Sequence, residues 1–168
     1  MHTYKKRETS GKMKHAIIFI GKTKDSFIQN GIEEYSSRLK HYTNIKITIL
    51  KDKSSGRSAR AAIESQGQQM LNAVPQGQGA VIVALDSRGQ QFTSESFCKK
   101  IVHWELSSVK QVTYLIGGPD GISKNILKSA GLVLSFSKMT FTHDMVRMLL
   151  IEQLYRAYTI KNGEKYHK

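Results

Sequence analysis

Apolar and polar positions along this chain follow two alternating patterns, one typical of buried strands and one typical of amphipathic helices. Apolar, strand-like runs predict strands at 15–20, 80–85, 112–116 and 132–136, and a further strand is expected at 45–50. Helical spacing follows the first run, and the predicted helix face consists of Phe27, Ile28, Ile32, Tyr35 and Leu39. Further helices are predicted over 59–73, from a cap at Thr93 or Ser94 to about 106, over 123–130, and from about Asp144 onward.

This alternation of strands and helices predicts an α/β fold. Parallel neighbours need crossover connections, so we expect a mainly parallel sheet of five to six strands with helices on both faces. The sequence Asp86-Ser87-Arg88-Gly89 has turn composition and is expected to turn the chain after the third strand. With 168 residues the chain suits one domain, which we place at 13–168. Residues 1–12 are polar and basic without periodicity, which predicts a disordered arm.

Charge narrows the class of partner. Lys and Arg together number 26 against 13 acidic residues, a formal net charge of +13. A surplus of positive charge of this size attracts polyanions through counterion release, so RNA or DNA is the expected large partner. The alternative is a generally basic surface that only keeps the protein soluble. The stretch 51–58 carries three basic residues and loop composition, which suits phosphate contact and an ordinary solvated connection equally well.

Cysteine usage and apolar run lengths indicate a compartment. Cys98 is the single cysteine, so no internal disulfide is possible, and no apolar run is long enough to cross a bilayer. A cytoplasmic protein without membrane association is therefore expected. The sequence shows no paired histidine or acidic spacing typical of metal ligands, so no metal site is expected either.

Two unusual loops follow the last two predicted strands. The first contains Gly117-Gly118-Pro119-Asp120-Gly121, in which the paired glycines allow a ligand to approach the backbone closely. A plain strand-to-helix turn is an equally good interpretation of the glycines alone. The loop matches neither the Walker phosphate loop nor the G-x-G-x-x-G dinucleotide fingerprint, which disfavours a triphosphate as its ligand.

The second loop, Ser137 to His143, mixes apolar side chains with hydroxyl groups. Its apolar members can flank an adenine or a methionine moiety while backbone groups recognise the polar edge, although Met and Phe in such places are more often core residues. In an open α/β sheet, ligands bind beyond the carboxyl ends of the strands. Two adjacent non-standard strand ends therefore predict a ligand pocket.

The final helix is apolar along much of its surface, which favours a second copy of the chain as its cover and therefore a homodimer. It also carries Arg147, Glu152 and Arg156, of which the last two are four apart and can simply pair with each other. His143 and His167 are candidate proton acceptors near neutral pH, although a lone histidine is more often structural or exposed.

Several of these segments together carry a family resemblance. They are Leu115 to Gly121, Leu134 to Phe141, Arg147, Glu152, Tyr155-Arg156-Ala157 and the closing Tyr166-His167-Lys168. From Met13 to its end the chain resembles the RlmH family, the small bacterial SPOUT-class methyltransferases that modify N3 of a pseudouridine in large-subunit ribosomal RNA. One departure is Thr142, at a position the family often fills with proline.

The resemblance implies an S-adenosylmethionine-dependent enzyme with a C-terminal trefoil knot that acts as a homodimer on assembled ribosomes. The cofactor pocket it implies consists of Leu85, Gly117, Gly118, Phe136, Ser137, Lys138, Met139, Thr140 and Phe141. It further implies that the C-terminal tail of one protomer meets the cofactor of the other. The catalytic candidates are then His143, Arg147, Tyr166 and His167, and the substrate-binding candidates are Arg147, Arg156 and Lys168.

The expected reaction is an in-line displacement that moves a methyl group from a sulfonium to a ring nitrogen in 23S ribosomal RNA. Most of the rate gain is expected from holding the nucleophile and the methyl carbon in a near-attack arrangement. His143 or His167 is the candidate base, solvent being the alternative, and Arg147 is the candidate cation for developing negative charge. Two other functions remain open, methylation of tRNA and a non-catalytic ribosome-associated RNA-binding factor.

Overall fold

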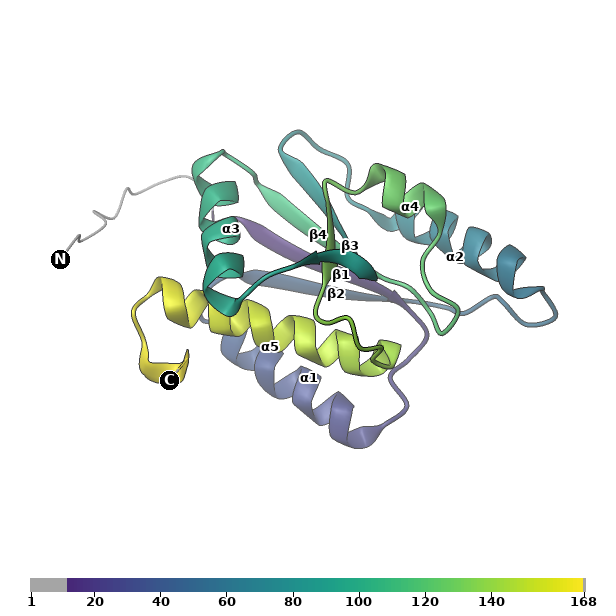
Figure 1. The fold of residues 1–168 in the computed structure, drawn as a ribbon, viewed down its shortest axis with the longest axis horizontal. Helices are drawn as coiled ribbons and strands as arrows, with labels where there is room; N and C mark the ends of the chain where they lie inside the picture. Colours follow the sequence, from purple (N-terminus) through teal and green to yellow (C-terminus); the bar gives the residue numbers. More distant parts are fainter. Residues whose placement is uncertain (1–11, 168) are drawn as a thin grey trace.

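The computed structural model describes residues 12–167, except for the side chain of His167 (Figure 1). The predicted arm at 1–12 therefore lies outside the described residues apart from Lys12, and so does Lys168. The strands are β1 (Lys14–Ile20), β2 (Asn44–Leu50), β3 (Ala80–Gln91), β4 (Gln111–Ile116) and β5 (Leu132–Ser135). The helices are α1 (Ser26–Leu39), α2 (Ala59–Ala73), α3 (Ser94–Leu106), α4 (Lys124–Ser129) and α5 (His143–Lys161), followed by the 3-10 turn η1 (Lys165–His167).

The strands form one five-stranded sheet in the order β2-β1-β4-β3-β5. Each neighbouring pair is parallel, which confirms the predicted α/β class. Because all the strands point the same way, their carboxyl ends meet at one edge of the sheet. The loops that follow β4 and β5 flank the end of β3 at this edge, because both strands pair with β3.

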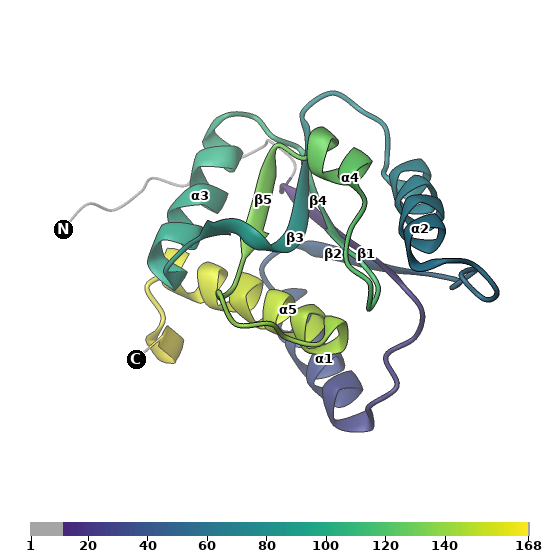
Figure 2. The ribbon, with the colours of Figure 1, turned by 45° about the vertical axis from the view of Figure 1, so that its right-hand side comes forward.

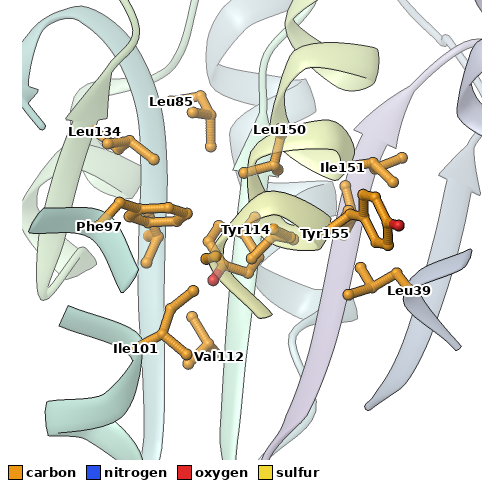
Figure 3. Packing of buried hydrophobic residues seen from close by; sticks show 14 of the residues in the cluster. Leu39, Leu85, Phe97, Ile101, Val112, Tyr114, Leu134, Leu150, Ile151 and Tyr155 are labelled. Atoms are coloured by element: carbon orange, nitrogen blue, oxygen red, sulfur yellow. The ribbon is translucent and has the colours of Figure 1, made fainter. Parts of the chain in front are cut away.

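Helices cover both faces of the sheet, as predicted (Figures 1 and 2). Successive side chains of β1 point to opposite faces, so Ile17 joins one core cluster and Ile18 joins the other. The larger cluster lies between the sheet and α1, α3 and α5, and Figure 3 shows Leu150 of α5 in it with Tyr114 of β4 and Phe97 of α3. The smaller cluster packs α2 and α4 against the opposite face. Burial on both faces explains why the central strands β1 and β4 are largely apolar, whereas the edge strand β2 is partly exposed and carries polar residues between its apolar ones.

Two expectations about local structure need correction. The third strand does not end at Leu85, because β3 continues to Gln91, and the segment 86–89 forms an irregularity inside it, where Leu85 and Gln90 both pair with Leu134 of β5. A bond from Ser135 Oγ to the Ser87 carbonyl, at 3.1 Å, helps to hold this extension beside β5. Phe27 shares no buried helix face with Ile32, since it lies in the first turn of α1 and is 77% exposed.

Each long helix begins at a side chain that accepts a backbone N–H, which meets the need for partners at helix starts. These caps are Asp25, Ser58, Thr93 and Thr142, and Ser123 caps the short α4. Thr142 therefore has a structural role at the position where the resembling family often has proline. Among the described residues no helix is long and apolar enough to span a membrane, and no cluster of three or more potential metal ligands occurs.

Candidate active site

A cavity of about 620 Å³ lies at the carboxyl ends of β4 and β5, beside Leu85, Asp86 and Ser87 of β3. This volume is within the range of small-molecule and cofactor sites. Of the predicted cofactor residues, the structure brings together Leu85, Gly117, Gly118, Phe136, Ser137, Met139, Thr140 and Phe141. Lys138 is not among the lining residues, so its contact with a cofactor stays a prediction.

The loop after β4 brings bare backbone to the cavity. A β-carbon on Gly117 would overlap the carbonyl oxygen of Gly121, so only glycine fits where the loop folds back on itself. Gly118 and Gly121 form an antiparallel bridge, and Gly121 adopts a φ of 101°, which disfavours other residues. Gly118 in turn lies against the side chain of Gln66, which supports the loop from α2.

The loop after β5 forms the opposite wall. The single proton of the Ser135 hydroxyl is shared between the Ser137 carbonyl, at 2.9 Å, and the Ser87 carbonyl, at 3.1 Å, and Ser137 Oγ accepts the Met139 N–H at 2.9 Å. These bonds fix the first half of the loop, while Met139 is left 75% exposed and Phe141 36% exposed at the rim. The cavity thus joins hydrogen-bonding backbone to apolar side chains, the combination that the sequence suggested for adenine and methionine groups.

The extension of β3 supplies lining residues that the sequence reasoning missed, Asp86 and Ser87. Arg88 binds the Asp86 carboxylate through two bonds of 2.8 Å, and this contact lowers the pKa of that carboxyl. Asp86 is therefore ionised near neutral pH. Its place directly after an apolar strand was the available signal, but the turn composition of 86–89 concealed it.

His143, the first residue of α5, reaches the cavity from the helix start. Its Nε2 lies 3.3 Å from Asp144 Oδ1. Burial lowers the pKa of His143, and the neighbouring positive charge of Arg147 lowers it further, while Asp144 opposes the shift. The imidazole is thus neutral at physiological pH, the form that can accept a proton.

Arg147 lies one helical turn further along α5 and is fully buried. Its guanidinium donates to the Ile20 carbonyl at 2.7 Å and to Thr23 Oγ1 at 3.0 Å, and it forms an ion pair of 2.8 Å with Asp144. It also lies over the Phe19 ring, 4.1 Å from the centroid. Arg147 braces the connection between β1 and α1 and does not line the cavity. Direct contact with substrate stays a prediction that requires this guanidinium to be uncovered.

The C-terminal candidates gather at the other end of α5. Tyr166 Oη donates to Glu152 Oε1 at 3.2 Å, and the Arg156 guanidinium lies 4.9 Å from the Tyr166 ring centroid. Arg156 and Glu152 pair at 2.9 Å, so the simple pairing that the sequence allowed is present. A helix rises about 1.5 Å per residue, which places Arg156 roughly 20 Å along α5 from His143. Within one protomer the structure does not bring Tyr166 or Arg156 to the cavity.

Comparison with known proteins identifies the family. A family model described as "Predicted SPOUT methyltransferase" matches residues 13–167. The chain belongs to this SPOUT methyltransferase family. Two similar relatives carry the name "Ribosomal RNA large subunit methyltransferase H". The one from Desulfotalea psychrophila is 53% identical over 156 residues, 93% of this chain and 100% of the relative. The one from Halothermothrix orenii is 39% identical over 161 residues, with the same two coverages.

Solved structures agree on the fold of the SPOUT chain. A probable methyltransferase from Bordetella pertussis aligns with a TM-score of 0.52 at 9% identity, over 88% of this chain and 95% of that chain. A probable methylase family protein from Haemophilus influenzae aligns with a TM-score of 0.51 at 13% identity, over 90% and 67% respectively. At such low identity the likeness concerns the fold alone.

SPOUT membership makes this chain an S-adenosylmethionine-dependent methyltransferase, and the cavity fits that cofactor. Gly117 and Gly118 bring backbone to the wall with no side chain in the way, and apolar residues such as Ile116, Leu134 and Val146 line the rest. Such walls suit a ligand that combines an apolar ring and thioether-like chain with polar edges.

Proposed function

We propose that this enzyme methylates N3 of a pseudouridine in 23S ribosomal RNA, acting in the cytoplasm on assembled ribosomes. The observation that carries the proposal is the cavity built by the loops after β4 and β5, in a chain 53% identical to a relative named for large-subunit ribosomal RNA methylation. The net charge of +13 supports a polyanionic substrate.

The bound cofactor supplies an electrophilic methyl group. The protein's part is to hold that group and the target base in line, and backbone groups of the loops after β4 and β5 would hold the cofactor in this arrangement. Neutral His143 at the rim of the cavity accepts the N3 proton, and Asp144 beside it stabilises the imidazolium that forms. His143 is therefore our first candidate for the base, with His167 as the second.

A homodimer completes the site in this proposal. The cavity lies at the start of α5 and Tyr166 packs near its end, so a protomer's own tail is directed away from its own cavity. Antiparallel packing of two α5 helices about a two-fold axis brings each tail toward the partner's cavity. Two exposed apolar side chains on the adjacent helices α1 and α5, Phe27 and Met145, support this face as the dimer interface. Tyr166, His167, Arg156 and Lys168 then approach substrate from the second protomer.

Methyl transfer to three substrates in parallel tests the target. Purified protein and methyl-labelled S-adenosylmethionine are incubated with assembled ribosomes, protein-free ribosomal RNA and bulk tRNA. We expect label in large-subunit RNA of assembled ribosomes only, because the described residues form a single sheet with its helices, so that the assembled shape of the ribosome must supply much of the recognition. Label in tRNA moves the target to tRNA. Absence of label, together with absence of cofactor binding, supports the non-catalytic RNA-binding factor.

A further inference from the structure

The carboxyl edge of the sheet extends beyond the cavity. In the order β2-β1-β4-β3-β5 the cavity lies at the ends of β4 and β5 and beside β3 between them, which leaves the ends of β1 and β2 on the same edge. Figure 1 shows the connections after β1 and β2 leaving the sheet at the end where the loop between β4 and α4 lies. Neighbouring strands lie about 4.8 Å apart, so the end of β2 is roughly 10 Å from the end of β4.

Positive charge is concentrated on these two connections. Residues 21–25 and 51–58, with the first turn of α2, carry six cations against the two carboxylates of Asp25 and Asp52. The cations, here called the basic edge, are Lys22, Lys24, Lys51, Lys53, Arg57 and Arg60, and all six are exposed. Within the described residues none of them forms an ion pair with a carboxylate.

The two carboxylates are already engaged by the fold. Asp25 Oδ1 accepts the Ile28 N–H and caps α1. Asp52 Oδ1 accepts the Ser54 N–H at 2.9 Å and the Gln66 side-chain amide at 3.1 Å. These bonds hold the acids against backbone and α2, while the cations remain available to a ligand. The segments 21–25 and 51–58 contain no apolar residue, so they suit a hydrated polyanion better than a membrane.

Two sets of contacts link the basic edge to the active site. The Lys24 N–H donates to Asp144 Oδ2 at 3.3 Å, directly beside His143. The charge of Lys24 also adds to the lowering of the pKa of His143, after burial and Arg147. On the other side, Gln66 binds Asp52 and lies against Gly118 of the cavity wall. A strand of phosphates along the basic edge would therefore end at the cavity mouth.

We propose that the basic edge binds the phosphate backbone of the RNA and leads it to the cavity. The inference deepens the proposed function and rests on it, because it names the surface by which the same site takes its RNA. It also selects between the two interpretations of residues 51–58, in favour of phosphate contact. Exposed lysine and arginine on mobile side chains hold phosphates without base recognition, so this surface contributes affinity and orientation.

Charge-neutralising variants test the proposal directly. The edge variant is Lys22→Gln with Lys53→Gln and Arg57→Gln, and the matched control is Lys40→Gln with Lys99→Gln and Lys128→Gln. The control removes the same charge from exposed positions at the end of α1, on α3 and on α4. Affinity for protein-free large-subunit ribosomal RNA is measured at several salt concentrations, with cofactor affinity and unfolding midpoint as folding controls.

The edge variant is expected to bind the RNA about tenfold or more weakly at 0.1 M salt, with the slope of log affinity against log salt reduced by roughly two to three. Cofactor affinity should stay at the wild-type value, and the control variant should bind RNA within about threefold of wild type. Equal losses in both variants, or none in the edge variant, overturn the proposal.

The binding measurement also separates this proposal from the proposed function. Selective loss of RNA binding in the edge variant supports the basic edge even if the wild-type enzyme transfers no methyl group to ribosomal RNA. The opposite result is also possible. If the wild-type enzyme methylates ribosomal RNA and the edge variant has an unchanged KM and RNA affinity, the proposed function holds and the proposal for the basic edge is wrong.

Discussion

At the scale of single residues, the most informative side chains are two buried polar groups that the sequence could not place. Arg147 was a candidate for substrate contact, yet the structure binds its guanidinium to Ile20, Thr23 and Asp144. His15 falls in an apolar run and is fully buried, with its ring nitrogens 2.9 Å from Tyr158 Oη and 3.3 Å from Tyr114 Oη. Both residues are held by partners from distant parts of the chain, which periodicity does not reveal.

Arg147→Lys is expected to destabilise the fold. A lysine ammonium cannot reach the Ile20 carbonyl, Thr23 and Asp144 together, and losing part of a buried charge network costs about 2–3 kcal/mol. Urea unfolding measures the loss. The control Arg156→Lys changes a partly exposed pair and should cost less than about 1 kcal/mol. Unchanged stability of Arg147→Lys would show that the guanidinium does not brace the loop.

His15 should make the protein sensitive to acid. Burial lowers the pKa of His15 from 6.5 to about 3, with a smaller effect from Lys161. Below pH 6.5 His15 is protonated in the unfolded chain but stays neutral in the folded chain. The contribution of His15 to the free energy of unfolding is therefore fully present above pH 6.5 and is lost as the pH decreases toward 3. At pH 5 His15 lowers the free energy of unfolding by about 2 kcal/mol relative to neutral pH.

Urea unfolding at pH 7.5 and pH 5.0 checks this prediction. His15→Asn should remove about 2 kcal/mol of the difference between the two pH values, whereas His41→Asn, at an exposed position, should leave it intact. The same pH dependence in wild type and His15→Asn would contradict the assignment.

At the scale of elements, the cavity depends on one turn that tolerates no side chain. Gly117→Ala places a β-carbon against the Gly121 carbonyl, so the loop after β4 must shift. We expect cofactor affinity to fall by about tenfold or more, equivalent to at least about 1.4 kcal/mol, in calorimetric titration. Gly77→Ala is the matched control, because its β-carbon meets nothing within 4 Å. Equal affinities in the two variants would exclude this loop from cofactor binding.

Element prediction from the sequence succeeded where burial creates a strong local pattern. Within residues 12–167 the five strands and the five α-helices were all expected, and α2 was predicted with the bounds observed. The end of the third strand was misplaced for a physical reason, since Gln90 and Gln91 pair with Leu134 and Ser135 more than 40 residues later. The turn composition of 86–89 marks the irregularity within the strand, whereas the pairing beyond it is non-local and does not show in local composition. The same extension carries Asp86 and Ser87 to the cavity, so part of the site was missed with it.

At the scale of the whole molecule, two predictions concern how the chain is threaded and paired. The trefoil knot that the family resemblance implies remains a prediction for this chain. The described fold brings the relevant segments together, since β5 lies against the extended β3 and a β-carbon on Gly89 would come within 2.6 Å of the Val133 carbonyl oxygen. The homodimer also remains a proposal, and the separation of the cavity and the tail along α5 supports it.

Mixed dimers test whether each site draws on two protomers. We expect His143→Ala and His167→Ala each to reduce turnover, one from the cavity side and the other from the tail side. Co-expressed and purified as a heterodimer, the two variants should recover activity, because one of the two composite sites then has both histidines. Sedimentation confirms the dimer. No recovery in a verified heterodimer would place both groups in one protomer or outside catalysis.

The central claim is that the cavity at the ends of β4 and β5, beside β3, serves methyl transfer to a base in large-subunit ribosomal RNA. The most direct measurement is mass spectrometry of nucleosides from ribosomes incubated with the enzyme and S-adenosylmethionine, with the Gly117→Ala variant alongside. We predict a single new product, pseudouridine methylated at N3, in 23S ribosomal RNA from the wild-type reaction and little from the variant. A methyl group on a ribose or a different base, or equal product from both proteins, would contradict the account.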